Sequence, residues 1–155
     1  MMAINHAVTG ALLGATVHQP AAALPLAFLS HFLLDAVPHY DPVTGSKADV
    51  INSKKFFREQ ILINGTLCVA LVLILAIDQP EYWLLMAVCA FLGASPDLMW
   101  VPRYFQVKRT GRDKPSRNGL LRFHSFIQWS TGPQFLWVEL LWLAVSCGCL
   151  VYFLG

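Results

Sequence analysis

Hydrophobic residues in this chain gather into five runs that short polar stretches separate. Such runs predict helices, and prolines follow or precede most of them, where a helix cannot continue. The pattern therefore predicts an all-α protein, a bundle of about five short helices. The runs cover Ala7–Val17, Ala21–Leu34, Ile61–Ile77, Tyr82–Ser95 and Pro133–Leu154.

The lengths of the runs suggest how they would sit in a membrane. A helix that crosses a bilayer takes about 20 residues, and the third and last runs reach roughly that length. The first two runs are shorter, so we expect either a tilted pair or a re-entrant hairpin that dips into the bilayer. Gly10 and Gly14 would strip side chains from one flank of the first helix and allow a neighbour to approach closely, although chance in a Gly/Ala-rich helix explains them equally well.

The composition agrees with a membrane protein. Hydrophobic residues make up 56% of the chain, charged residues only 13%, and the mean hydropathy is +0.54. A soluble domain carries roughly 45–50% apolar and about 25% charged residues. The 155 residues contain no linker-like stretch, so we expect a single membrane-embedded helical domain over residues 1–155. The alternative is a soluble helical domain. Partitioning after an alkaline carbonate wash of the membranes would distinguish the two.

The basic residues predict an orientation. All 11 lysines and arginines lie between the second and third runs or between the fourth and fifth, whereas residues 18–20 and 78–81 contain none. The positive-inside rule then places the N-terminus and both basic loops in the cytoplasm, for a protein of the inner (plasma) membrane. The loop over residues 103–122 either follows this rule alone or also gathers anionic phospholipids or a phosphorylated substrate.

Histidines and aspartates occur at run ends that this topology brings to one side of the membrane. Imidazoles and carboxylates are usual ligands of zinc, manganese and iron, so the set predicts a metal site. His31 and Asp35 are four residues apart and share a helical face, and Pro38 ends that helix so that His39 and Asp41 can curl back over it. The candidates are His6, His31, Asp35, His39, Asp41, Asp97 and His124.

Each candidate also has a simpler interpretation. His31 and Asp35 could hydrogen-bond each other and join helices without an ion. Asp97 could be the N-cap of a following helix, since aspartate is a good cap. His6 alone would be a solvated terminal residue, and His124 an interfacial histidine. We favour the metal site because ionisable groups within a membrane are costly and are usually functional.

Several short motifs resemble those of a known family. They are His6 with Thr9-Gly10, the block of residues 30–41, Ser95-Pro96-Asp97-Leu98 and Phe123-His124-Ser125. They look like the motifs of the small inner-membrane metal-dependent hydrolases, a group distantly similar to zinc-dependent phospholipase C. That family often carries an Asp-His after its Pro-Asp step and two histidines in the late motif, where this chain has Leu98-Met99 and His124 alone. The resemblance implies hydrolase activity and leaves the ligand count open.

These observations predict a membrane-bound, metal-dependent hydrolase of phosphoesters such as a lipid headgroup. One or two divalent ions, zinc before manganese or iron, would lower the pKa of bound water towards ~7 and stabilise charge on a phosphoryl oxygen. Asp35 and Asp97 are the expected catalytic carboxylates, which bridge or orient. The sequence contains no nucleophile elbow, phosphate loop or dinucleotide fingerprint, and the cluster alone does not predict a nucleic-acid substrate. The alternative is a non-catalytic metal-binding membrane scaffold or a small transport-related protein.

Overall fold

The described part of the chain folds almost entirely into helices. A computed structural model describes residues 1–41, 53, 57–78, 81–112 and 118–154. Consecutive helices often run on without a break, so these residues form six helical segments where the pattern predicted about five. The elements are α1 (Ala3–Val17), α2 (Pro20–Asp35), the π-helix η1 (Phe57–Ile63), α5 (Asn64–Asp78), α6 (Trp83–Ala94), the 3-10 helix η2 (Ser95–Trp100), α7 (Val101–Thr110), α8 (Gly119–Ile127), the 3-10 helix η3 (Pro133–Phe135) and α9 (Leu136–Leu154).

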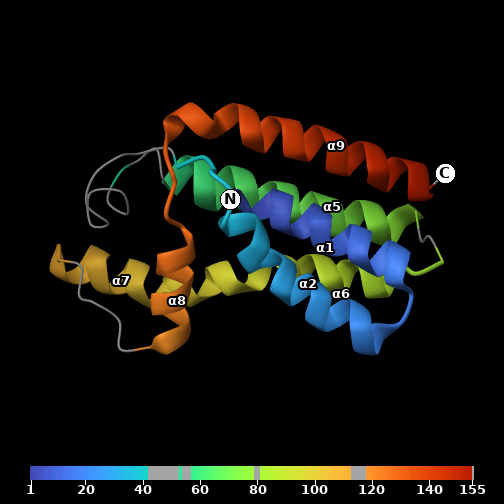
Figure 1. Ribbon diagram of the computed structural model, residues 1–155, viewed down its shortest axis with the longest axis horizontal. Coiled ribbons are helices and arrows are strands. Elements are labelled where there is room, and N and C mark those ends of the chain that lie inside the picture. The colour runs from blue at the N-terminus through green and yellow to red at the C-terminus, as the bar shows by residue number, and fades with distance from the viewer. Residues whose placement is uncertain (42–52, 54–56, 79–80, 113–117, 155) are drawn as a thin grey trace.

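Helix α1 lies at the centre of the bundle. It contacts α2, α5, α6 and α9, and its small residues Ala7, Ala11 and Ala15 are buried. The neighbouring helices alternate in direction, so α1, α5 and α9 begin at the end of the bundle where α2 and α6 finish (Figure 1). We call this the site end. Helix α8 crosses the bundle there, and α7 extends beyond it.

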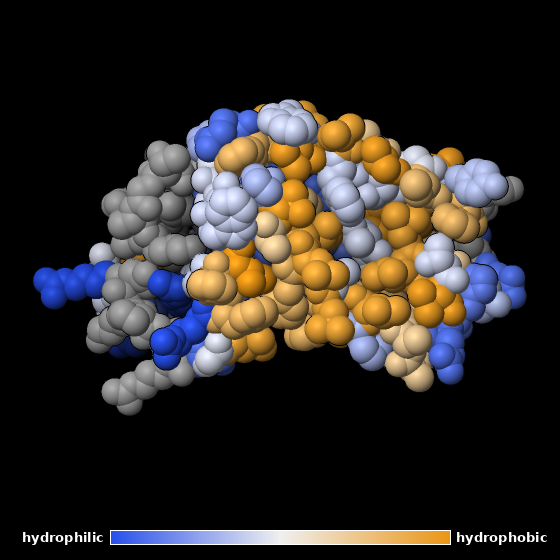
Figure 2. Space-filling model, viewed as in Figure 1, coloured by the Kyte–Doolittle hydropathy of each residue, from blue (hydrophilic) through white to orange (hydrophobic). Residues whose placement is uncertain are grey.

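Among the described residues, three helical segments are long and apolar enough to cross a membrane: Arg58–Asp78, Trp83–Thr110 and Pro133–Phe153. Their surfaces carry exposed large apolar side chains, which water would disfavour and lipid would solvate. Apolar residues cover the middle of the face in Figure 2, with hydrophilic residues towards the ends. The architecture fits the predicted membrane protein, while its orientation and a re-entrant α1–α2 pair stay predictions.

The predicted fourth run, Tyr82–Ser95, matches the α-helix α6, which ends at Ala94. The pattern did not predict that helical structure continues through η2 and α7 to Thr110, which gives a segment of 28 residues from Trp83. Pro96 and Pro102 each fall in the first turn of a new helical element, where the missing amide hydrogen costs nothing. The prolines therefore change the helix type without ending the helix. Asp97 lies inside η2 and does not cap a helix.

Glycines allow α1 and α6 to touch along their backbones. A Cβ atom on Gly10 would collide with the carbonyl oxygen of Cys89, and one on Gly14 would lie 2.7 Å from the Cα of Met86. On the opposite helix, a Cβ on Gly93 would lie 2.5 Å from the carbonyl oxygen of His6. The predicted close approach at Gly10 and Gly14 is confirmed, and the partner is α6.

Gly10→Ala should destabilise the bundle, because a single added methyl group must push two backbones apart. We expect a loss of about 1–3 kcal/mol in the free energy of unfolding, as for overpacked interiors. Gly148→Ala is the matched control, since a Cβ there meets nothing within 4 Å. Unfolding of both variants in mixed detergent micelles, followed by circular dichroism, measures the difference. Equal midpoints for the two variants would contradict this account of the packing.

Candidate metal centre

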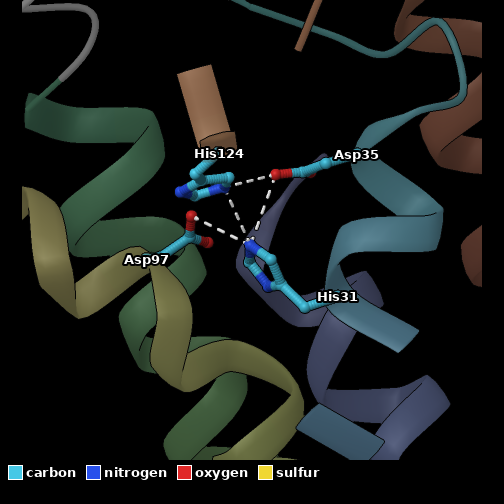
Figure 3. Close-up of side chains that lie close together, drawn as sticks. All are labelled: His31, Asp35, Asp97 and His124. Carbon is cyan, nitrogen blue, oxygen red and sulfur yellow. Dashed lines mark hydrogen bonds and ion pairs between the residues drawn. The ribbon is translucent and has the colours of Figure 1, made fainter. Parts of the chain in front are cut away.

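Four predicted ligands converge at the site end. His31 and Asp35 come from the last turns of α2, Asp97 from η2 and His124 from α8, and their side chains point towards one another (Figure 3). Each offers one ligand atom, and these atoms all lie within 4.8 Å of one another. The topology thus brings together residues from three separate parts of the sequence.

The spacing of these atoms suits a small divalent ion. Nε2 of His31 lies 3.3 Å from Oδ2 of Asp35, 3.7 Å from Oδ1 of Asp97 and 3.0 Å from Nε2 of His124. Tetrahedral ligands that sit 2.0–2.1 Å from zinc are roughly 3.3 Å from each other. Two imidazoles and two carboxylates are a donor set that zinc accepts, so the residues fit a metal ion.

His31 is oriented as metal-binding histidines usually are. Its Nδ1–H donates a hydrogen bond to the carbonyl oxygen of Gly93 at 2.8 Å. In the neutral ring, Nε2 therefore keeps its lone pair and faces the carboxylates of Asp35 and Asp97. Acceptors that meet in this way repel each other unless a proton or a cation lies between them.

Asp35 is the most heavily bonded group of the cluster. Its Oδ1 accepts from the N-terminal ammonium of Met1 at 2.5 Å and lies 3.1 Å from Nε2 of His6. Its Oδ2 lies 2.6 Å from Nε2 of His124 and accepts from Nε2 of Gln128 at 2.9 Å. Both oxygens thus have partners without an ion, which is also what a purely structural link between helices would show.

His124 would have to change its tautomer to bind an ion through Nε2. The indole N–H of Trp100 can only donate, and it points at Nδ1 of His124 at 3.3 Å. The neutral ring therefore carries its proton on Nε2 and donates it to Asp35. An ion on Nε2 would displace this proton, and the Trp100 indole would then turn away from Nδ1.

His6 lies directly behind the cluster. Its ring stacks on that of His31, with centroids 3.9 Å apart and planes 24° apart. Nε2 approaches Asp35, while Nδ1 is buried and has no hydrogen-bond partner. His6 is outside the group of four whose ligand atoms converge. It supports Asp35 and His31 from the α1 side.

The predicted ligands His39 and Asp41 are not brought into the group of four. Backbone hydrogen bonds hold their segment against the loop after α8, because His39 N–H donates to Ser130 and Asp41 N–H to Gly132. The ring of His39 donates from Nδ1 to the carbonyl oxygen of Val37. Burial, aided by the nearby N-terminal ammonium, lowers the pKa of His39 to about 4, so its ring is neutral at physiological pH. Their roles as ligands stay predictions.

A cavity of about 760 Å³ opens beside the cluster and reaches Asp97. The side chain of Asp97 is 33% exposed, whereas His31, Asp35 and His124 are fully buried. Asp97 is therefore the member of the four that a molecule in the cavity can approach. His39 and Asp41 line this cavity with Met1 and Gln128.

Glu139 is a buried acid whose partners the sequence did not reveal. It lies on α9, is 0% exposed, and accepts from the backbone N–H of Met2 and from the Asn5 amide at 3.0 and 2.6 Å. Its second oxygen accepts from the backbone N–H of Tyr40 at 3.1 Å. A lone acid in an apolar run was the available signal. The residue ties α9 to the start of α1 and to the segment after α2.

The phenol of Tyr40 extends this network towards η1. It donates to the carboxylate of Glu59 at 2.6 Å. Burial, together with that hydrogen bond and the negative charge of Glu59, raises the pKa of Tyr40 to about 12. The phenol therefore keeps its proton at physiological pH and fixes η1 beside the site end.

Comparison with protein-family models, with curated proteins and with solved structures finds no match to this chain.

Metal content tests the cluster directly. The purified wild-type protein should carry a divalent ion, and Asp97→Asn should weaken its binding by about 100-fold or more, beyond the effect of changing an outer-shell partner. Asp97 forms no hydrogen bond in the described structure, so this variant should fold. His31→Ala should lose the ion as well. His18→Ala is the control, because His18 stacks on Tyr82 away from the cluster. Unchanged metal content in the first two variants would contradict the site.

Glu139→Gln tests the network on α9. The NH2 group of the glutamine would face N–H donors that now bind a carboxylate oxygen, so at least one buried donor would lose its acceptor. An unsatisfied buried donor lowers the stability of the fold by about 1–3 kcal/mol. We expect this loss in the free energy of unfolding, measured by denaturation in detergent. Glu81→Gln, at an exposed acid, should change it little. A variant as stable as the wild type would show that Glu139 does not hold α9 in place.

Proposed function

We propose that the protein is a membrane-bound, metal-dependent hydrolase of phosphoesters. The observation that carries the proposal is the buried His31 Nε2, which faces Asp35 and Asp97 beside a cavity. Two carboxylates, two imidazoles and an adjoining space for a substrate are the parts that metal-assisted hydrolysis needs. We further propose one zinc ion, with manganese or iron as alternatives, and a cytoplasm-facing site in the plasma membrane.

The four residues of the cluster would have different roles, because they differ in burial. His31 and His124 would supply neutral nitrogen ligands, and Asp35 and Asp97 the negative charge that balances a divalent ion. Together these residues would hold a divalent ion, which when bound would supply Lewis acidity and lower the pKa of a coordinated water molecule. Hydrogen bonds hold both oxygens of Asp35, so this residue would keep the arrangement of the ligands around the ion fixed. Asp97 faces the cavity and would orient the attacking water.

A non-catalytic scaffold is the second candidate, and one observation favours it. Asp35 has hydrogen-bond partners on both oxygens without any ion, so the cluster can join α1, α2 and α8 by itself. In that case the four side chains would stabilise the fold and turn over no substrate. Metal binding and turnover together separate the two candidates.

Turnover by zinc-loaded protein tests the hydrolase. We expect zinc-dependent hydrolysis of p-nitrophenyl phosphate, its bis-ester or phosphatidic acid, lost with a chelator and restored by zinc. His124→Ala and Asp97→Asn should lower kcat/KM by about 10³-fold, since the ion contributes several kcal/mol to the transition state. His18→Ala should keep wild-type turnover. Bound zinc without turnover of any of the three esters would contradict the proposal and support the scaffold.

A further inference from the structure

We propose that the cavity beside Asp97 holds an acyl chain of a bilayer phospholipid, which enters sideways between α5 and the continuous helix α6–η2–α7. The phosphate of the lipid would then lie at the Asp97 end. The reaction of this lipid rests on the proposed function, whereas its binding does not.

The walls of the cavity are largely apolar. Its volume of about 760 Å³ lies within the roughly 300–1,000 Å³ of typical ligand sites. Two membrane-spanning segments supply the apolar lining: Ile61 and Cys68 from one, and Phe91, Leu98 and Phe105 from the other. A hydrocarbon chain gains free energy by leaving water for such a surface. A small soluble phosphoester would leave most of this wall unused.

The same apolar walls reach the outer surface of the bundle. Ile61 is 40% exposed, Phe91 59%, Leu98 55% and Phe105 64%, and all four line the cavity. These residues lie on segments that are apolar enough to span a membrane, so their exposed surface would face lipid. A lipid tail could thus enter without crossing water.

Polar groups also line the cavity. They include Tyr40, Asp41, Gln128 and Thr131, which come from the segments that follow α2 and α8. Gln128 connects them to the metal cluster, because its Nε2 donates to Oδ2 of Asp35. The cavity therefore combines an apolar wall with polar groups, and its lining includes Asp97, a member of the cluster. An amphiphile with a charged head and a hydrocarbon tail matches both parts. A phosphate suits the head because the bound ion would offset the charge of the carboxylates.

Gly65 provides a way to fill the cavity without disturbing the helix. It lines the cavity on α5, and a Cβ placed there meets nothing within 4 Å. Gly65→Phe should therefore project a ring into the space that the acyl chain would occupy. Gly148→Phe is the matched control, because Gly148 is equally open, lies on another spanning segment and does not line the cavity.

The test uses the zinc-loaded full chain in lipid nanodiscs, with phosphatidic acid that carries a diazirine in the middle of one acyl chain. After irradiation, mass spectrometry should find the label on cavity residues such as Cys68 and Tyr104. Gly65→Phe should reduce this labelling at least tenfold, while Gly148→Phe should leave it unchanged. For turnover, Gly65→Phe should lower kcat/KM for phosphatidic acid about tenfold and leave p-nitrophenyl phosphate hydrolysis unchanged.

The outcomes separate this inference from the proposed function. Labelling inside the cavity that Gly65→Phe abolishes, with no turnover, would support the lipid site and refute the hydrolase. Turnover of soluble esters, with label spread evenly over the outer surface and no effect of Gly65→Phe, would overturn the lipid site and keep the hydrolase. Equal loss of labelling in Gly148→Phe would also overturn it.

Discussion

The buried carboxylate of Asp35 is the constraint around which the site end is built. Asp35 is 1% exposed, and a buried charge is strongly unfavourable unless it is paired and hydrogen-bonded, so it needs compensating groups. The N-terminal ammonium and His6 lie at one oxygen of Asp35, and His124 and Gln128 lie at the other. One acid therefore links the start of α1, the end of α2, His124 of α8 and Gln128 just after α8.

The close contact between α1 and α6 at their glycines is connected to the groups that surround Asp35. Gly93 lies against the carbonyl oxygen of His6, where no larger residue fits, and its own carbonyl oxygen accepts a hydrogen bond from Nδ1–H of His31. Because His31 lies on α2, Gly93 contacts α1 through its Cα and α2 through its carbonyl oxygen. One residue of α6 therefore both packs against α1 and sets the tautomer of His31.

The sequence predicts the members of the cluster better than their surroundings. The four-residue spacing of His31 and Asp35, and the positions of Asp97 and His124 at the ends of apolar runs, predicted that these residues share one end, and in the structure their ligand atoms converge. The positions of His39 and Asp41 depend on backbone pairing with residues 130–132, far along the chain, which no local pattern encodes. The cavity and the continuous helix through η2 depend likewise on how distant segments pack.

The two acids of the cluster differ in a way that a structural link alone does not explain. A carboxylate that only joins helices should be saturated with donors, as Asp35 is. Asp97 has no such partner in the described part of the chain. Its carboxylate lies 3.7 Å from His31 Nε2, beyond hydrogen-bond distance, and its side chain is one third exposed, beside a cavity. One acid is fixed and one is open, which is the division expected where an ion must be held on one side and a substrate reached on the other.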